Sequence, residues 1–421
     1  MLSQSESSTR IGHSVAAAVS RRPVVRRAGA FWLVAMALAT TMLGTTLPTP
    51  LYVLYEQQLG LATFMGTVIF AVYAAGVLAA LLALGRASDE FGRRRVLLVG
   101  LVFAAMSAAC FVLATGPALL IVGRVLSGLA AGVFTGTATA ALVDLAGTGR
   151  GSRATMVATG SSMGGLGLGA LLAGVLAQVA PLPLRLPFWV DLGLVVLAGL
   201  ALWAVPETVE VPERPRLQIR PPDVPAQVRP AFLRAAIAGF AGFAVLGMFT
   251  AVTPSFLLDL LNEPSHALSG ALVFALFAAS ALGQVALAGP LGHRAMAAGC
   301  GGLIVGMGLL AAGLATTSLP LVIAAAVIAG LGQGLCMRGG LEAVTTVAPA
   351  QSRAGVASAF FVVMYVAISV PVVGEGLAAT RLGLRTAGIT FTVAVAAIAA
   401  VALATLLRAS PTSQGRLTAN T

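Results

Sequence analysis

The chain has 421 residues, of which 58% are hydrophobic and only 9% are charged. No soluble fold of this size could solvate so apolar a surface, so the composition excludes a soluble globular protein. The formal net charge of +11 comes from 25 basic residues, all of them arginine, against 14 acidic ones, and most of the arginines lie in the segments between apolar runs. This distribution is typical of a membrane protein, and we expect no binding of nucleic acid.

Uncharged apolar runs recur along the whole chain, and most are long enough to cross a bilayer as a helix. A charge at the bilayer centre costs about 2.5–3.5 kcal/mol, which explains why charged residues are rare in these runs. Turn signals at 115–117 and 316–320 divide two longer stretches. We expect twelve spans, near 29–54, 62–84, 96–115, 117–142, 154–180, 187–205, 232–259, 267–289, 296–316, 319–345, 354–378 and 385–407.

The arginines indicate how these spans are oriented. With the N-terminus inside the cell, 20 of the 25 arginines fall in cytoplasmic segments, which predicts that both termini are cytoplasmic. An all-arginine chain rich in Ala, Gly, Leu and Val also hints at a GC-rich bacterial genome, so we expect a multi-pass protein of the bacterial inner membrane. The predicted organisation is a cytoplasmic N-terminal segment (1–28), a six-helix bundle (29–205), a cytoplasmic linker rich in proline and charge (206–231), a second six-helix bundle (232–408) and a cytoplasmic tail (409–421).

The second half of the chain repeats the first. At an offset of 204 residues, Phe70 coincides with Phe274, and Thr49-Pro50 coincides with Thr253-Pro254. Because each half has six spans, both repeats enter the membrane in the same orientation. Two parallel six-helix repeats with a site at their interface near the midplane are typical of a transporter.

Residues 85–95, between the second and third predicted spans, read G-R-A-S-D-E-F-G-R-R-R. This loop resembles the signature G-x-x-x-D-[RK]-x-G-R-[RK] of the major facilitator superfamily. The resemblance extends to span number, linker and repeats, and implies an all-α integral membrane fold with twelve transmembrane helices in two parallel six-helix bundles. It further implies a conformational latch in which Asp89 faces the start of the eleventh span near Arg353. The latch residues would be Gly85, Asp89, Gly92, Arg93 and Arg94.

Two departures from the signature concern charge. Glu90 stands where the family usually has a basic residue, and His293 occupies the position of the aspartate in the second-half copy of the loop. The second copy is therefore a poor candidate for a latch.

In the fourth span an arginine is followed by glycines at every fourth position: Arg124, Gly128, Gly132 and Gly136. This pattern resembles that of proton-coupled members of the family. Residues four apart share one helix face, so the glycines would pack on a neighbouring helix while Arg124 points into a cavity. The alternative is that Arg124 extends outward to the membrane surface. Arg124 is a candidate for proton coupling, together with the intramembrane carboxyls of Asp191 and Glu375, because burial disfavours a charged carboxyl.

Further polar residues are candidates for a substrate cavity. Thr45, Thr49 and Tyr52 lie near the outer end of the first span, although threonines also hydrogen-bond to their own helix. Gln333, Arg338 and Glu342 of the tenth span are further cavity candidates, and Arg124 of the fourth span is a candidate for the cavity as well as for proton coupling. Arg338 and Glu342 are spaced i,i+4, so a structural ion pair is an alternative to substrate binding.

The fifth span is rich in glycine. Residues 165–174 resemble the fifth-helix motif G-x-x-x-G-P-x-x-G-G of drug:proton antiporters, with Ala170 in place of the proline and Ala173 in place of a glycine. The resemblance suggests antiport, whereas the alternative is that the glycines serve tight helix packing.

We therefore expect a secondary active transporter that works by alternating access and exports a small amphipathic molecule or drug in exchange for protons. A proton-coupled importer of a small metabolite is the alternative. We expect no enzymatic activity, because the three histidines are isolated and no nucleophile–base pair or nucleotide-binding loop is apparent. A sensor that derives from a transporter but does not transport is a further alternative. The expected partners are a small-molecule substrate and membrane lipid, the energy source is a proton gradient rather than a cofactor, no metal is expected, and the chain is expected to be a monomer.

Overall fold

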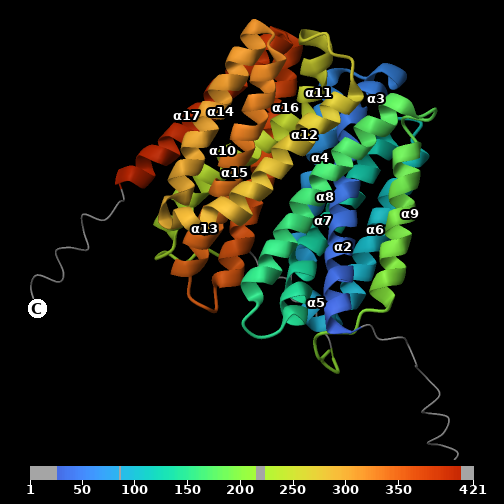
Figure 1. Ribbon diagram of the computed structural model, residues 1–421, viewed down its shortest axis with the longest axis vertical. Helices are drawn as coiled ribbons and strands as arrows, with labels where there is room; N and C mark the ends of the chain where they lie inside the picture. Colours follow the sequence, from blue (N-terminus) through green and yellow to red (C-terminus); the bar gives the residue numbers. More distant parts are fainter. Residues whose placement is uncertain (1–25, 85–86, 215–222, 409–421) are drawn as a thin grey trace, which may run out of the picture.

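The computed structural model describes residues 26–84, 87–214 and 223–408, and its regular structure there is helical (Figure 1). The helices fall into two groups that pack mainly within themselves. The first group contains α2 (Arg27–Thr46), α3 (Tyr52–Leu59), α4 (Thr63–Leu84), α5 (Ala87–Phe91), α6 (Arg93–Val112), α7 (Pro117–Ala146), α8 (Gly151–Val179) and α9 (Leu186–Trp203). The second contains α10 (Arg229–Ala251), α11 (Thr253–Ser255), α12 (His266–Leu282), α13 (Ala288–Leu291), α14 (Ala295–Thr316), α15 (Leu319–Val347), α16 (Arg353–Leu382) and α17 (Leu384–Arg408).

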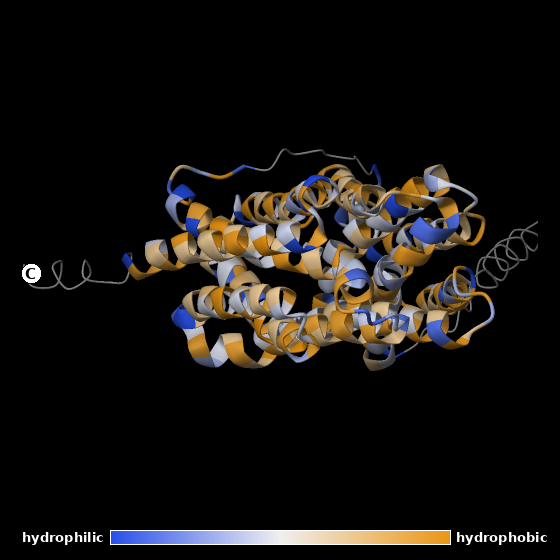
Figure 2. Ribbon diagram, turned by 90° about the horizontal axis from the view of Figure 1, so that it is seen from above, coloured by the Kyte–Doolittle hydropathy of each residue, from blue (hydrophilic) through white to orange (hydrophobic). Residues whose placement is uncertain are grey.

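In the described part of the chain, eleven helical runs are long and apolar enough to cross a membrane. One of them, His266–Thr316, has 51 residues. At 1.5 Å per residue such a run would measure about 76 Å, more than twice the roughly 30 Å of hydrocarbon, so it cannot be a single crossing. It consists of α12 and α14 joined by short helical turns, which gives twelve crossings and confirms the predicted fold class. Hydrophobic residues predominate along the helices, and hydrophilic ones gather in the connecting segments (Figure 2).

The sequence repeat is visible as matching interruptions in the first helix of each bundle. After α2, a 3₁₀ turn at Thr49–Leu51 precedes α3, and after α10, the short helix α11 begins at Thr253. Each interruption carries a proline, which has no N–H to donate to a helix. The predicted spans 29–54 and 232–259 therefore each contain a break in the α-helix, since α2 ends at Thr46 and α10 at Ala251.

Within the first bundle, α4 and α7 approach so closely that glycine is required at their contact. A Cβ on Gly128 would collide with the backbone carbonyl of Tyr73, and one on Gly132 would meet Ala80 and Val77. By contrast, nothing lies near the position of a Cβ on Gly136. Two of the three predicted packing glycines therefore pack on α4, and the third does not pack.

This contact gives a first prediction. Gly128→Leu should force α4 and α7 apart and lower the free energy of unfolding by about 1–3 kcal/mol, the usual cost of overpacking. Gly136→Leu is the matched control and should leave stability unchanged, because its side chain meets open space. Thermal unfolding of the purified variants in detergent measures both. Equal melting temperatures for the two variants would contradict the close contact.

The two bundles pack against each other over the middle and one end of the molecule. We call the end that carries α5 and the connection between α9 and α10 the linker end, and the opposite one, with α3 and α11, the distal end (Figure 1). The main contacts between bundles join α8 to α12 and α4 to α16. Toward the distal end, the backbone N–H of His266 donates to Gln178 Oε1 at 2.9 Å, and Ser369 Oγ donates to the carbonyl of Ala71 at 3.3 Å.

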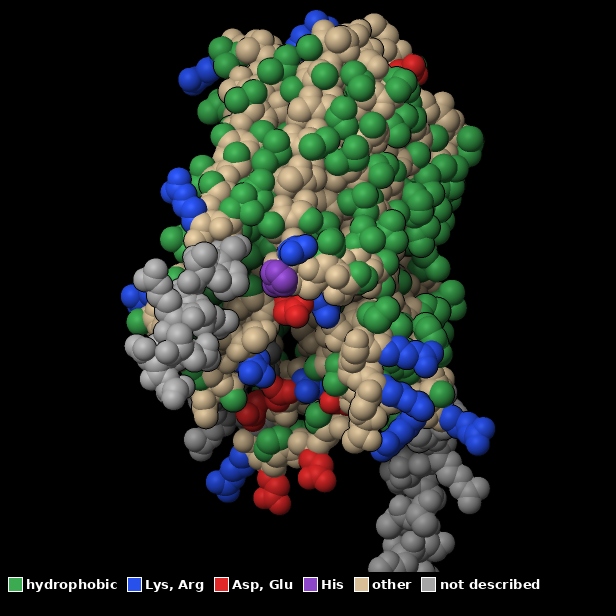
Figure 3. Space-filling model, turned by 60° about the vertical axis from the view of Figure 1, so that its left-hand side comes forward, with side chains coloured by type: hydrophobic (Ala, Val, Ile, Leu, Met, Phe, Trp, Pro, Cys, Tyr) green, Lys and Arg blue, Asp and Glu red, His purple; other side chains and the backbone are tan. Residues whose placement is uncertain are grey.

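Toward the linker end the bundles separate. Among the described residues, the hydrogen bonds that join the two bundles lie at or beyond the level of Ser280, on the distal side. Figure 3 shows an opening between two lobes near the linker end, with acidic and basic side chains around it. The molecule is therefore closed at its distal end and open at its linker end.

Candidate functional site

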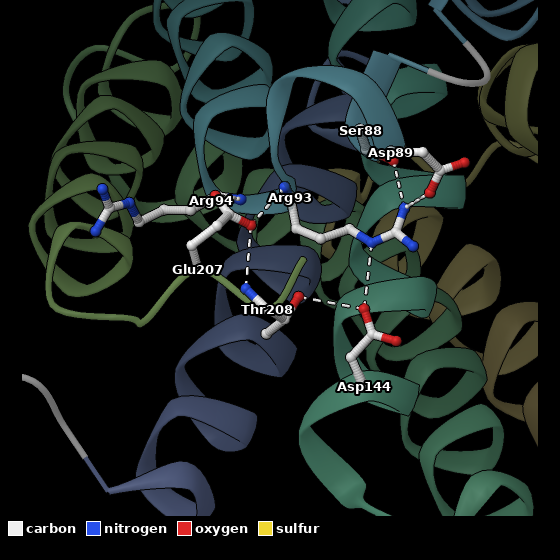
Figure 4. Close-up of polar contacts among 7 residues, drawn as sticks. All are labelled: Ser88, Asp89, Arg93, Arg94, Asp144, Glu207 and Thr208. Atoms are coloured by element: carbon white, nitrogen blue, oxygen red, sulfur yellow. Dashed lines mark hydrogen bonds and ion pairs between the residues drawn. The ribbon is translucent and has the colours of Figure 1, made fainter. Parts of the chain in front are cut away.

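Arg93 is the centre of a polar network at the linker end of the first bundle (Figure 4). Its guanidinium forms an ion pair with Asp89 Oδ1 at 2.6 Å and another with Asp144 Oδ2 at 3.3 Å, and it donates to Ser88 Oγ at 2.7 Å. Thr208 Oγ1 also donates to Asp144, at 3.2 Å. The network thereby joins α5, α6, the end of α7 and the segment that follows α9.

Glu207 caps the start of α6. Gly92 adopts φ = 96°, a left-handed conformation that favours glycine, and this turn exposes the first N–H groups of the helix. The carboxylate of Glu207 accepts from the backbone N–H of Arg93 at 2.7 Å and of Arg94 at 3.3 Å. A negative charge at a helix N-terminus is also favoured by the helix dipole. Glu207 thus fixes the start of the linker onto the loop.

We therefore expect Glu207→Ala to destabilise this corner. Removing a side-chain cap costs about 0.5–2 kcal/mol, and thermal unfolding should detect the loss as a lower melting temperature. Glu210→Ala is the control, because Glu210 is exposed and has no polar partner among the described residues. An unchanged melting temperature in Glu207→Ala would show that the cap contributes nothing.

The predicted latch is only partly assembled in this conformation. The side chain of Asp89 is 58% exposed and pairs with Arg93 of its own bundle. Among the described residues, no hydrogen bond or ion pair joins Asp89 to Arg353 in this state, so the approach of Asp89 to the eleventh span stays a prediction. Arg94 donates to the carbonyl of Val205 at 3.3 Å, and Gly85 lies outside the described residues.

Arg124 points into the protein, and the alternative of an outward-facing side chain is wrong. It is 1% exposed and donates to the backbone carbonyl of Thr45 at 2.6 Å. Its guanidinium carbon lies 4.9 Å from the ring centroid of Tyr73 and 5.5 Å from that of Phe70. Cation–π contacts of this kind stabilise a desolvated guanidinium.

The aromatic cluster around Arg124 continues into the second bundle. The ring of Tyr73 on α4 lies 6.4 Å from that of Tyr365 on α16, with the planes at 61°. Tyr52 is also buried, and its hydroxyl has no hydrogen-bond partner among the described residues. Sequence reasoning missed the role of these aromatic partners, although Phe70 and Tyr73 belong to the best-matched part of the repeat.

The threonines of the first span behave differently from one another. Thr45 Oγ1 donates to the carbonyl of Met42 at 2.7 Å, in its own helix, so its hydroxyl could serve a ligand only as a hydrogen-bond acceptor. Thr49 is also buried, but its hydroxyl has no partner. The equivalent residue of the second repeat, Thr253, likewise has a buried hydroxyl without a partner.

Asp191 and Glu375 are both buried, each with 3% exposure. Both carboxyl oxygens of Glu375, and Oδ1 of Asp191, have no hydrogen-bond partner among the described residues. Asp191 on α9 lies against Gly44 of α2, where a Cβ would come within 2.8 Å of its carboxylate. Gly376, next to Glu375, packs against Thr67 of α4 in the other bundle. Among the described residues, the ion pairs are those of Arg93, so the structure does not pair either carboxyl with Arg124.

In the second bundle the buried polar group is Gln333. Ser280 donates to Gln333 Oε1 at 2.5 Å and accepts from Gln284 Nε2 at 3.1 Å. Ser280 also lies 3.7 Å from the sulfur of Met163 on α8, which places this cluster at the bundle interface. Ser280 and Gln284 belong to no sequence motif, so sequence reasoning could not identify them as partners in this cluster.

The structure does not contain the ion pair considered for Arg338 and Glu342. The two residues share a face of α15, but no ion pair joins them in the described part of the chain, and Glu342 is exposed. The glycines of the fifth span do pack closely: Gly165 and Gly169 lie against α2, and Gly174 lies against α12 of the other bundle.

Comparison with known proteins gives one family. The profile of the Major Facilitator Superfamily matches residues 33–371. A triacylglyceride transporter from Mycolicibacterium smegmatis is 31% identical over 161 residues, and one from Mycobacteroides abscessus is 33% identical over 161 residues. Each alignment covers 36% of this chain, and it covers 27% and 30% of the two relatives, so the chain matches less than a third of either protein.

Solved structures with the same fold cover most of the chain. A bacterial homologue of the human lysosomal transporter Spinster has a TM-score of 0.74 at 16% identity, covering 91% of this chain and 98% of that one. A POT family transporter in complex with 5-aminolevulinic acid has a TM-score of 0.73 at 15% identity, covering 91% and 96%. At these identities the likeness concerns the fold alone.

Proposed function

The chain belongs to the major facilitator superfamily, a family of secondary transporters rather than enzymes, and we propose that it exports a small amphipathic molecule or drug in exchange for protons. The observation that carries this proposal is the pair of buried carboxyls without partners, in a molecule closed at one end and open at the other. A charged carboxylate within the hydrocarbon region of the bilayer is costly, so a carboxyl there tends to bind a proton. Such a group is suited to carry a proton between the two faces of the membrane. Arg124, Asp191 and Glu375 are the candidates for this coupling, and we prefer Glu375 to Asp191 because α16 contacts α4 of the other bundle.

The character of the central interface supports an amphipathic cargo. The side chains that meet between the bundles include Tyr73, Tyr365, Phe274 and Met163, and few polar groups lie among them. Aromatic and methionine side chains suit a largely apolar ligand. The triacylglyceride transporters among the relatives are consistent with such a cargo. The proposed cavity residues are Thr45, Thr49, Tyr52, Arg124, Gln333, Arg338 and Glu342.

We further propose that the linker end faces the cytoplasm of a bacterium, with both termini on that side, and that a monomer is the working unit. The predominance of arginine in the segments at this end supports the orientation. In this orientation the structure is the inward-open state. The latch at Asp89, Gly92, Arg93 and Arg94 would then close against the second bundle when the linker ends approach each other in the outward-open state.

Proteoliposomes test the proposal directly. Purified protein is reconstituted with an acidic interior and a pH-sensitive dye, and a panel of amphipathic toxic compounds is added outside. We expect some compounds to be taken up while the proton gradient dissipates, and we expect the same compounds to be less toxic to a host that expresses the protein. Uptake of a small metabolite together with protons would instead favour the importer alternative, which the buried cation Arg124 makes reasonable for an anionic metabolite.

A further inference from the structure

We infer that the cargo of this transporter carries an anionic head group, a carboxylate or a phosphate, and that Arg124 binds it together with Tyr52. This inference rests on the proposed function, because it specifies the cargo of the same site. The observation that carries it is a buried cation that the protein itself does not neutralise.

Among the described residues, Arg124 is the arginine that is buried, with 1% exposure. A buried charge is normally compensated by an opposite charge, because desolvating it costs several kcal/mol. The contacts of Arg124 are the carbonyl of Thr45 and the faces of Phe70 and Tyr73, all of which are neutral. The ion pairs in the described residues belong to Arg93 at the linker end. Within the part of the chain that the structure describes, the guanidinium therefore has no counter-ion in this state.

The site also has unused hydrogen-bond donors. A guanidinium has five N–H groups, and here Nη1 donates to Thr45 while Nε, although buried, has no partner. The hydroxyl of Tyr52 is buried without a partner as well, and it lies close enough to Arg124 for an electrostatic interaction. A planar guanidinium with a nearby hydroxyl is well suited to hold two oxygens of a carboxylate or phosphate.

The surroundings suit an apolar tail on the same ligand. The rings that flank Arg124 are aromatic, and Tyr73 contacts Tyr365 of the second bundle. This contact lies between the bundles, where a ligand could enter when they move apart. A ligand whose head reaches Arg124 would then place its tail along the aromatic surface between α4 and α16.

Asp191 is the alternative counter-ion. It lies against Gly44, next to Thr45, whose carbonyl accepts from Arg124. If Asp191 paired with Arg124 in another state, the cation would be neutralised by the protein and the cargo would need no charge. The experiment below separates these two cases.

The test measures binding of three probes that share a ten-carbon tail: decanoate, decanol and decyltrimethylammonium. The protein is held in nanodiscs at pH 7.5 without a proton gradient, and empty nanodiscs correct for partition into lipid. We expect decanoate to bind at least about 10-fold more tightly than the other two. Arg124→Gln should remove this preference and leave decanol binding unchanged, whereas Tyr52→Phe should weaken decanoate binding several-fold. Arg381→Gln, at an exposed arginine of the distal end, is the control and should bind like the unmodified protein.

Equal affinity for the three head groups in the unmodified protein would overturn the inference, even if Arg124→Gln failed to fold. Undiminished decanoate binding in Arg124→Gln would overturn it too, and so would a preference for decanoate that appears only in Asp191→Asn. Failure of the proposed function has a different signature. If decanoate binds selectively but its transport never moves protons, the coupling is wrong and the head-group assignment stands.

Discussion

Joining Gln178 on α8 to His266 on α12 by a disulfide should abolish transport. The backbone N–H of His266 donates to Gln178 Oε1 at 2.9 Å, so these two positions face each other across the two bundles. Alternating access requires these distal ends to separate once in every cycle. A covalent bond between them would hold the molecule in the state seen here, whatever its cargo.

The experiment starts from a protein in which Cys110, Cys300 and Cys336 are replaced by serine, since these are the native cysteines. The pair Gln178→Cys and His266→Cys is oxidised, and transport into proteoliposomes is compared before oxidation, after oxidation and after reduction. We expect loss of essentially all transport on oxidation and recovery on reduction. The two single-cysteine variants are controls and should be unaffected by oxidation. Full transport by a completely cross-linked protein would mean that the distal ends do not separate during the cycle.

The overall fold could be predicted from the sequence because the bilayer imposes one dominant constraint. Charged residues are excluded from spanning helices, so the charge-free runs mark the spans almost directly. The same criterion fails where the chain stays apolar but the helix is broken. At Thr49-Pro50 and Thr253-Pro254 the hydropathy does not change, and only the missing proline N–H reveals the interruption.

The candidate site was less predictable, because its contacts join residues that are remote in the sequence. The spacing of Arg124 from Gly128 and Gly132 predicted its direction, but not that its partners would be a backbone carbonyl and two aromatic rings. Glu207 caps a helix that begins 114 residues earlier, and a local pattern does not reveal such a pairing. Conversely, the i,i+4 spacing of Arg338 and Glu342 suggested an ion pair that does not form, since Glu342 is exposed and water competes for its charge.

The buried carboxyls give the second large effect. We expect Glu375→Gln to abolish proton-driven transport, by 100-fold or more, while exchange of cargo down its own gradient continues. The reason for choosing Glu375 over Asp191 is its position on α16, a helix that contacts α4 of the other bundle. The surroundings of Glu375 must change when the bundles move, so a proton there can be taken up on one side and released on the other. Asp191 lies on α9, whose main neighbours α2, α6 and α8 belong to its own bundle.

Asp191→Asn is therefore the matched comparison, because it removes a carboxyl of equal burial from a helix whose surroundings stay constant. Pumping against a gradient, measured with the pH-sensitive dye, should persist in Asp191→Asn and disappear in Glu375→Gln. Counterflow of labelled cargo, measured without a proton gradient, should persist in both variants and show that both are folded. The opposite assignment, with pumping lost only in Asp191→Asn, would place the proton inside the first bundle. Coupling would then depend on movement of α9 against α2 rather than on the separation of the two bundles.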